Sequence, residues 1–428
     1  MKEKAINGSI KKIALVAIFL IFLVGTVSAE FDITIDGIVP DYKYGDAVFA
    51  YETNSVNVVI ENIGDEESPS GTVYLNVSDV NGGSTIIASA AFGSIAEYDS
   101  TTVTLTDSTP RYSQGTITYS AYVVCSDEEE YMENSTNVRY NGYKGKRYWT
   151  DASDIDTVRT YEGNGNMSYF TQPSTSYKST KWTTRTETWT TGDLYVPASA
   201  TIIDARLYIS YNWDNTTTAN PDAPPAFTAT FNTNPLSLGT PYTDKSNFGD
   251  YGDKEYGLFS INVTNYYNRN SDNNLVMTAD PSGYTQALYP STLVVIYSDL
   301  NETYKQIFVN EECDELAVAD TTTHKYGTTE EEATAYAPFT LMTINNATAK
   351  AATLYSFAGS AGSAEGNLII NGNTVATNAW TGNYYTASPL VYSFPSVSSL
   401  FASGNEAGIQ GTEYGGMLAL QNLLVVEY

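Results

Sequence analysis

The sequence contains little histidine, little cysteine and few basic residues. His324 is the single histidine among 428 residues, so a Ser-His-Asp triad or a histidine metal site would depend on that one side chain. The motifs Gly-x-Ser-x-Gly, His-Glu-x-x-His and the phosphate-binding glycine loop are absent. A close pair of carboxylates is inevitable among 49 acidic residues, so it gives little support to a hydrolase. We expect a protein that is not an enzyme.

The two cysteines, Cys125 and Cys313, are too few for a scaffold built on disulfides. They could form one bridge, within a chain or between chains, in an oxidising compartment; the alternative is two free thiols. Acidic residues follow Cys125 and flank Cys313 in the sequence, which raises the pKa of a thiol and opposes the thiolate. Neither cysteine is therefore expected to be a nucleophile.

Basic residues number 21 against 49 acidic residues, which gives a formal net charge of −28. Such a charge disfavours nucleic acid and anionic membrane surfaces as partners, and it suits divalent cations or a saline environment. Calcium is the one cofactor that the sequence suggests, because carboxylates gather in two loops. The candidate ligands are Asp151, Asp154, Asp156, Asp250 and Asp253, and solvated loops without a metal are the alternative.

Long hydrophobic runs are also scarce. Four lysines precede the apolar run from Ile13 to Val27, and the small residues Val27-Ser28-Ala29 follow, which is typical of a signal peptide at residues 1–29. The run is 15 residues long, whereas a spanning helix needs ~20, so an uncleaved anchor is the weaker alternative. With no second such run, we expect an extracellular protein without a membrane anchor after cleavage.

Short runs rich in Thr, Tyr, Val and Ile, broken by Asn, Gly, Asp and Pro, fill the rest of the chain without helical periodicity. In the segment from Ala205 to Tyr211 apolar and polar residues alternate, as a strand with one buried face requires. We expect an all-β protein. An immunoglobulin-like sandwich is predicted at 30–141 and two related jelly-roll-like sandwiches at 157–300 and 301–428.

Residues 142–156 are predicted to be a linker, because they are Gly-rich and polar. They contain the only cluster of basic residues after the signal region, Lys144, Lys146 and Arg147. We expect solvated loop charges there and no anion-binding role.

The two predicted jelly rolls share short sequence matches that indicate an internal duplication. The offset between the copies falls steadily from 147 to 131 residues, as small deletions in the second copy would produce. The matched pairs are Ala205-Arg206-Leu207-Tyr208 with Ala352-Thr353-Leu354-Tyr355, Phe231-Asn232 with Ile370-Asn371, Asn274-Leu275-Val276 with Ala407-Gly408-Ile409, and Leu293-Val294-Val295 with Leu424-Val425-Val426.

Two stretches resemble known families. The strand from Val56 to Gly64, an acidic loop and a second strand from Gly71 to Val77 resemble the CARDB-like, immunoglobulin-like adhesion modules of archaeal and bacterial surface proteins. The C-terminal pair of domains resembles uncharacterised tandem β-domain surface proteins of methanogenic archaea. That resemblance rests on Gly192 to Pro197, Ala205 to Tyr208, Phe231-Asn232 and Asn262-Val263-Thr264. It implies a location in the cell envelope and no known activity.

Asn-x-Ser/Thr triplets offer glycosylation sites in an exported chain. The candidates are Asn76, Asn134, Asn166, Asn215, Asn301 and Asn346, and Asn262, within a strand, is expected to be the least accessible triplet. The 35 tyrosines suit sheet surfaces, subunit interfaces and sugar stacking alike.

Together these features favour a secreted structural subunit of an archaeal cell envelope, such as a sheath, surface layer or filament. It would be a homo-oligomer or polymer that assembles through sheet edges and Tyr-rich faces, with other envelope proteins or polysaccharide as further partners. The alternative is a carbohydrate-binding or adhesion module that stacks Trp182, Trp189, Trp213 and Trp380 on sugars. A hydrolase is the third possibility.

Overall fold

The computed structural model describes residues 31–42, 45–78, 84–108, 115–148, 154–179, 182–215, 227–246, 254–280, 286–318, 328–362, 364–381, 387–412 and 416–428. Strands dominate, and three 3-10 turns, η1 (Lys146–Tyr148), η2 (Ser174–Ser176) and η3 (Val397–Ser399), complete the regular structure of these residues. The predicted all-β fold class is confirmed. None of the described segments forms a helix long and apolar enough to cross a membrane. The predicted signal peptide at residues 1–29 lies outside the described residues.

The first region is a sandwich of two antiparallel sheets with one parallel edge pair. One sheet has the order β1-β3-β6 and the other β2-β8-β7-β4-β5. Buried side chains alternate with partly exposed ones along β3, so Val56, Val58 and Ile60 enter the core. The strands are β1 (Ile33–Pro40), β2 (Ala47–Phe49), β3 (Asn54–Asn62), β4 (Gly71–Ser78), β5 (Ser84–Phe92), β6 (Ser100–Asp107), β7 (Gly115–Cys125) and β8 (Glu128–Arg139).

The second region contains two sandwiches with the same strand order. The first comprises β9 (Asp156–Thr171), β10 (Thr184–Trp189), β11 (Thr201–Asn215), β12 (Phe227–Phe231), β13 (Asn234–Pro235), β14 (Tyr242–Ser246), β15 (Lys254–Asn262), β16 (Asn273–Ala279), β17 (Ala287–Leu288) and β18 (Thr292–Ser298). The second comprises β19 (Tyr304–Leu316), β20 (Thr334–Phe339), β21 (Ala351–Gly359), β22 (Asn367–Ile370), β23 (Asn373–Ala376), β24 (Ala387–Ser393), β25 (Asn405–Gln410) and β26 (Met417–Glu427).

Each sandwich has the jelly-roll arrangement. The order β9-β18-β11-β15 in the first corresponds to β19-β26-β21-β24 in the second. The smaller sheets correspond in the same way, β10-β16-β12-β13 to β20-β25-β22-β23. Two related jelly rolls are therefore present, as the sequence matches predicted.

Equivalent turns fix the alignment of the two copies. Asn232 and Asn371 both have a positive φ, 48° and 50°, directly after β12 and β22. The Oδ1 of Asn232 accepts from the backbone N–H of Asn274, and that of Asn371 accepts from the backbone N–H of Glu406, each at 2.8 Å. Asn274 therefore corresponds to Glu406, and the sequence match of Asn274 with Ala407 is wrong by one residue.

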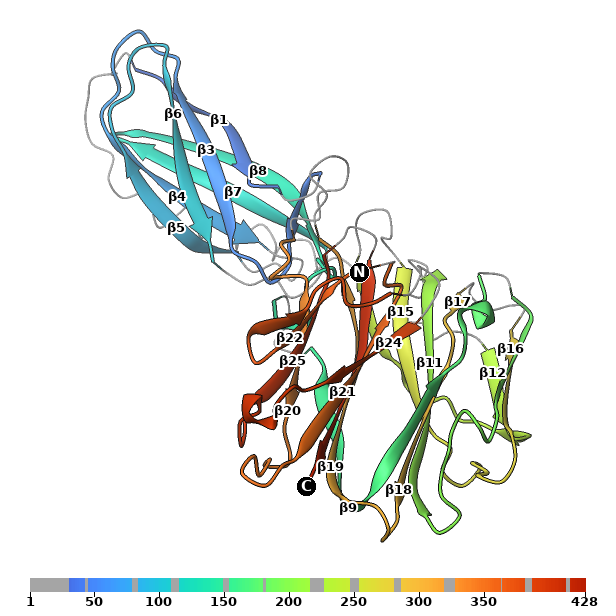
Figure 1. Ribbon diagram of the computed structural model, residues 1–428. Helices are drawn as coiled ribbons and strands as arrows, with labels where there is room; N and C mark the ends of the chain where they lie inside the picture. Colours follow the sequence, from blue (N-terminus) through green and yellow to red (C-terminus); the bar gives the residue numbers. More distant parts are fainter. Residues whose placement is uncertain are drawn as a thin grey trace, which may run out of the picture.

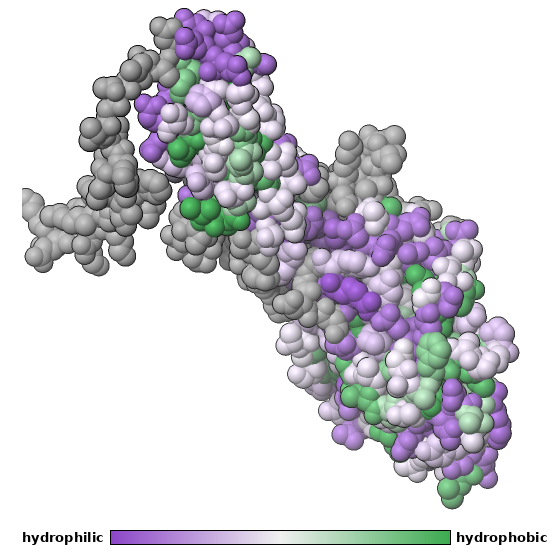
Figure 2. Space-filling view, turned by 90° about the vertical axis from the view of Figure 1, so that its left-hand side faces the viewer, coloured by the Kyte–Doolittle hydropathy of each residue, from purple (hydrophilic) through white to green (hydrophobic). Residues whose placement is uncertain are grey.

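The two jelly rolls are not separate bodies, because their larger sheets form one continuous ten-stranded sheet. Strand β9 pairs with β19 along 156–164 and with β18 along 165–171. The outer faces of the two halves pack against each other around a shared apolar cluster that includes Leu258, Ile296, Val309 and Leu420. Figure 1 shows this double jelly roll, with the first sandwich projecting from one corner. On the face drawn in Figure 2, hydrophilic residues predominate in both regions and hydrophobic patches are small.

Candidate functional site

The basic cluster of the predicted linker joins the first sandwich to the double jelly roll. Lys144 is buried, and its Nζ lies 2.8 Å from Glu52 Oε1 and 2.6 Å from Glu332 Oε1. Glu52 precedes β3, whereas Glu332 precedes β20. Burial lowers the pKa of Lys144, but the two carboxylates outweigh this effect and raise the pKa above its usual value. Gly145 permits the close approach, because a Cβ there would lie 2.1 Å from the carbonyl oxygen of Thr334.

The next two basic residues contact both jelly rolls. Lys146 Nζ lies 2.8 Å from Glu312 Oε1 and donates to the carbonyl of Thr243 at 3.1 Å. Arg147 forms an ion pair with Glu406 at 2.8 Å and lies over the ring of Tyr336, 3.7 Å from the centroid. The expectation of solvated loop charges is therefore wrong, because carboxylates distant in the sequence pair with these side chains.

The predicted calcium ligands are only partly described. Asp154 is buried, and its two oxygens accept from the backbone N–H of Arg147 at 2.5 Å and of Tyr336 at 2.9 Å. Asp154 thus holds the linker against the second jelly roll, and Asp156 is exposed at the start of β9. Asp151, Asp250 and Asp253 lie outside the described residues. Within the described part of the chain, no three His, Cys, Asp or Glu residues are grouped to hold a metal ion, and calcium remains a prediction.

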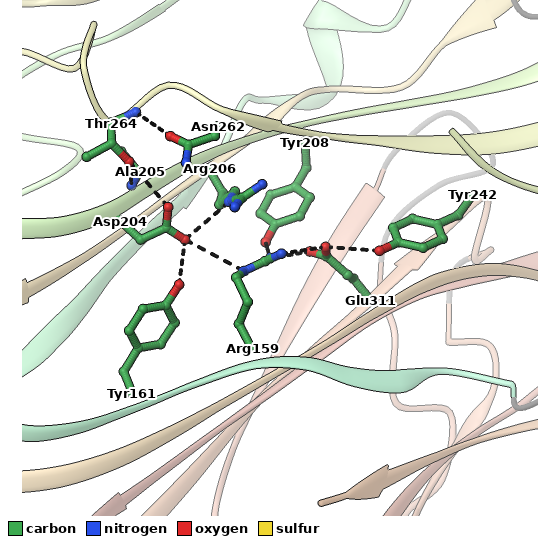
Figure 3. Close-up of polar contacts among 10 residues, drawn as sticks. All are labelled: Arg159, Tyr161, Asp204, Ala205, Arg206, Tyr208, Tyr242, Asn262, Thr264 and Glu311. Atoms are coloured by element: carbon green, nitrogen blue, oxygen red, sulfur yellow. Dashed lines mark hydrogen bonds and ion pairs between the residues drawn. The ribbon is translucent and has the colours of Figure 1, made fainter. Parts of the chain in front are cut away.

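A second ionic network lies between the two jelly rolls (Figure 3). Arg159 on β9 binds Glu311 on β19 with both terminal nitrogens, at 2.7 and 3.0 Å. The same guanidinium donates to the hydroxyl of Tyr208 at 3.1 Å, and its Nε lies 3.7 Å from Asp204 on β11. Asp204 also accepts from Tyr161 at 2.7 Å. The network connects β19 of the second roll, β11 of the first roll and β9, which pairs with strands of both rolls.

Three more acidic side chains are buried near this network. The backbone N–H of Glu315 donates to Asp244 at 2.7 Å, and that of Lys146 donates to Asp314 at 3.0 Å. One oxygen of Asp314 and one of Glu315 are buried without a hydrogen bond. Burial, and then repulsion from Asp244, raises the pKa of both carboxyl groups well above their usual range. A protonated carboxyl closed off from solvent suits packing between domains better than chemistry on a substrate.

Both cysteines are free thiols and fully buried, so the predicted disulfide within the chain is wrong. Cys125 lies in the core of the first sandwich and Cys313 between the two jelly rolls. Burial raises the pKa of both thiols, as the acidic flanks suggested. A bridge between chains would require each sulfur to leave its core.

Two of the four tryptophans proposed to stack on sugars are core residues. Trp189 and Trp380 are buried in the cores of the first and second jelly roll. Trp182 is half-buried against Phe227, and the side chain of Trp213 lies outside the described residues. The interpretation of Trp189 and Trp380 as stacking platforms is wrong, because indole rings of this size fill the cores.

The glycosylation candidates differ in accessibility. Asn301 and Asn346 are exposed in turns, whereas Asn76, Asn134 and Asn166 are half-buried on strands. The amide of Asn134 donates to the carbonyl of Ile38 at 2.7 Å. The side chain of Asn215 lies outside the described residues. Glycosylation remains a prediction at all six positions.

Sequence reasoning missed where the tyrosines go. Tyr208, Tyr256 and Tyr289 are buried between the two jelly rolls, and Tyr161, Tyr169, Tyr177, Tyr242 and Tyr355 pack against the same cluster. The signal was present in strand β11, where Tyr208 alternates with the core residues Leu207 and Ile209. Because a second sheet covers that face, its tyrosines are internal.

Comparisons with known proteins divide the chain at the same linker. The family described as "Protein of unknown function (DUF3344)" matches residues 142–427, and the CARDB family matches residues 32–140. No curated protein matches the sequence. Similar solved structures include the CARDB domain of the PF1109 protein from Pyrococcus furiosus in complex with di-metal ions, at 20% identity and a TM-score of 0.20, over 26% of this chain and 97% of that one.

A β-glucosidase from Listeria innocua in complex with isofagomine is similar at 16% identity and a TM-score of 0.19, over 27% of this chain and 17% of the enzyme. The immunoglobulin-like character of the first sandwich therefore rests on the CARDB family match and on its two-sheet architecture. The match to the other family spans the linker and both jelly rolls, which is more than half of the chain. The chain belongs to the DUF3344 family and carries a CARDB domain ahead of the family's region.

Proposed function

We propose that this protein is a secreted, non-catalytic structural subunit of an archaeal cell envelope, a sheath, surface-layer or filament component. CARDB is an adhesion-related immunoglobulin-like domain, and such a domain is compatible with an extracellular adhesion or structural role. The observation that carries the proposal is that ion pairs connect the domains. The ion pairs of Lys144 and Arg159 lie between domains and join them into one body.

Self-assembly is proposed to occur through the edge strand β5 of the CARDB domain. β5 pairs with β4 on one side and ends its sheet. It contains no charged residue and no proline, and Ile86 is 65% exposed. Edge strands of this composition are templates for a strand of another chain, although a bulge opposite Leu75 and Asn76 interrupts the first part of β5.

Four other edge strands are less suited to pairing between chains. β13, β20 and β24 each contain a proline, which cannot donate to a neighbouring strand, and β14 packs beside β19. Eight of the tyrosines that the sequence suggested for assembly lie in or against the cluster between the two jelly rolls. Among the edge strands of the described chain, which also include β1, β2, β6, β10 and β23, we favour a pairing of β5 edges between copies.

The test measures the abundance of the mature protein in native envelopes and its oligomeric state in solution. We expect it to be abundant in isolated envelopes and to form higher oligomers in sedimentation velocity at high salt, which screens its net charge. Ser89→Lys on β5 should abolish the oligomers, whereas Thr102→Lys on edge strand β6 should not. A protein that is monomeric at all salt concentrations and absent from envelopes would contradict the proposal.

Adhesion through a binding surface is the second candidate, and one observation favours it. Tyr74, Tyr122 and Tyr131 form a row on the outer face of the CARDB sheet that no other part of the described chain buries fully. Retention of intact cells on immobilised protein would test adhesion directly.

A further inference from the structure

Three tyrosines lie side by side across the outer face of the five-stranded CARDB sheet. Tyr74 on β4 is directly opposite Tyr122 on β7, which is directly opposite Tyr131 on β8. The rings of Tyr74 and Tyr122 are 6.3 Å apart and tilted by 38°. Neighbouring residues on the same strands, such as Val73 and Val123, point into the core, so the row faces outward.

Two carboxylates hold the exposed end of this row. The hydroxyl of Tyr131 donates to Glu133, and the hydroxyl of Tyr122 is hydrogen-bonded to Glu129. Burial and then the bond to the adjacent carboxylate raise the pKa of both phenols, so both stay neutral donors. Glu129 and Glu133 lie two residues before and after Tyr131 on β8 and therefore flank its ring on the same face. The ring itself remains accessible, because Tyr131 is 57% exposed.

The CARDB domain that carries the row is strongly acidic. Residues 31–140 contain 18 acidic and 3 basic residues, a formal charge of 3 − 18 = −15. Within the described residues, no ion pair joins Glu129 or Glu133 to a basic side chain. Aromatic ring faces and carboxylates both attract cations. The same charges repel nucleic acid, anionic polysaccharide and the acidic surface of a second copy.

We propose that the row of Tyr74, Tyr122 and Tyr131, with Glu129 and Glu133, is a docking surface for a lysine- or arginine-bearing segment of a basic partner protein. A cationic head group would lie over the ring of Tyr131 between the two carboxylates, the apolar part of its side chain would cross the ring of Tyr122, and the peptide backbone would lie near Tyr74. Two strand spacings of ~4.8 Å make the row about 10 Å long, which matches roughly three residues of extended peptide. This proposal does not depend on assembly through β5.

The test is calorimetric titration of the full mature chain with hexalysine at low and moderate salt. We expect Tyr131→Ala to weaken binding by roughly 2–5-fold, the usual size of an exposed cation–π contact. Glu129→Gln with Glu133→Gln should weaken it at least as much, and Tyr131→Phe should retain most of the binding. Circular dichroism and thermal melting check that each variant is folded.

Matched controls separate this site from general attraction to an acidic protein. Tyr195→Ala removes another exposed tyrosine, and Glu66→Gln with Glu67→Gln removes two exposed charges elsewhere in the CARDB domain. Both should bind hexalysine within a factor of two of the wild type. Equal losses in controls and site variants, or no binding of hexalysine at low salt, would overturn the proposal. Binding of a neutral oligosaccharide that requires Tyr131 would instead assign the row to glycan recognition.

Discussion

The CARDB domain and the double jelly roll bury charge in different ways. In the CARDB domain, strands such as β3 bury every second residue and leave the others partly exposed. In the double jelly roll, β26 and most of β19 are buried on both faces, and ion pairs such as Arg159–Glu311 lie inside. A sheet covered on one side can keep its charges in water, whereas a sheet covered on both sides must pair or protonate them. We expect the two regions to respond differently to the loss of a single charge.

The largest expected effect is the loss of Arg159. Arg159→Met leaves Glu311 buried without its partner, which typically costs about 3–5 kcal/mol. Calorimetry should show a lower transition temperature for the double jelly roll and an unchanged transition for the CARDB domain. The matched control is Arg206→Met, because Arg206 makes one contact with Asp204, at 3.2 Å, whereas Arg159 binds Glu311 with two nitrogens. Asp204 keeps Arg159 as a partner in this variant, so the loss of Arg206 should cost less than the loss of Arg159. Equal effects of the two substitutions would mean that the network contributes little to the contact between the rolls.

Removing Lys144 should separate the two regions. Lys144→Ala leaves Glu52 and Glu332 facing each other across the linker and should cost about 1–3 kcal/mol. Limited proteolysis should then cut between residues 142 and 148 faster than in the wild type. Lys350→Ala, at an exposed position in the second roll, is the control that should leave the cleavage rate unchanged. An unaltered rate in the Lys144 variant would show that other contacts suffice to fix the CARDB domain.

Asp314 should make the stability of the double jelly roll depend on pH. Its pKa is raised in the folded protein, so its contribution is complete below ~3.9, the unfolded value, and is lost as the pH rises through the folded pKa. Asp314→Asn should therefore stabilise the roll at pH 7 by about 1 kcal/mol or more, and the gain should shrink toward pH 4. Denaturant unfolding from pH 4 to 8 measures this difference.

Exposed Asp156→Asn is the control for Asp314, with an expected change within ~0.5 kcal/mol. A variant at Asp314 that is less stable at pH 7 than the wild type would mean that this carboxylate is ionised and held by Lys146. The comparison thus distinguishes a buried proton from a buried ion pair.

The last prediction concerns the two equivalent turns. Asn232→Ala and Asn371→Ala each remove a hydrogen bond to a backbone N–H at a positive φ, and each should cost about 1–2 kcal/mol in thermal unfolding. The Gly variants at the same positions should cost less, because glycine tolerates this φ. Costs that differ several-fold between the two turns would weaken the equivalence of the copies.

The fold class and the duplication could be predicted from sequence because both depend on local patterns. Alternation in β11 and the repeated Asn after β12 and β22 are visible without any tertiary information. The one-residue error at Asn274 arose because the predicted match aligned Val276 with Ile409, two similar β-branched residues, whereas the strand pairing makes Val276 equivalent to Gly408. The sequence alone does not reveal the hydrogen bond between Glu406 and the Asn371 turn.

The role of the linker could not be predicted, for a different physical reason. Lys144 lies 92 residues from Glu52 and 188 residues from Glu332 in the sequence, so nothing local distinguishes it from a solvated lysine. The burial of Tyr208 and Cys313 likewise depends on one roll covering the other. Sequence patterns indicate which face of a strand is apolar, but they do not indicate what covers a face of mixed composition.

The shared strand β9 also determines when the molecule can fold during synthesis. Arg159 on β9 pairs with Val309 on β19, which emerges from the ribosome 150 residues later. At ~5–20 residues per second, the first half of β9 waits roughly 8–30 s for its partner. The CARDB domain, whose strands are complete by Arg139, can fold within that interval. The CARDB domain should therefore fold first, and the two jelly rolls should fold together later. The first half of β9 stays unpaired until then.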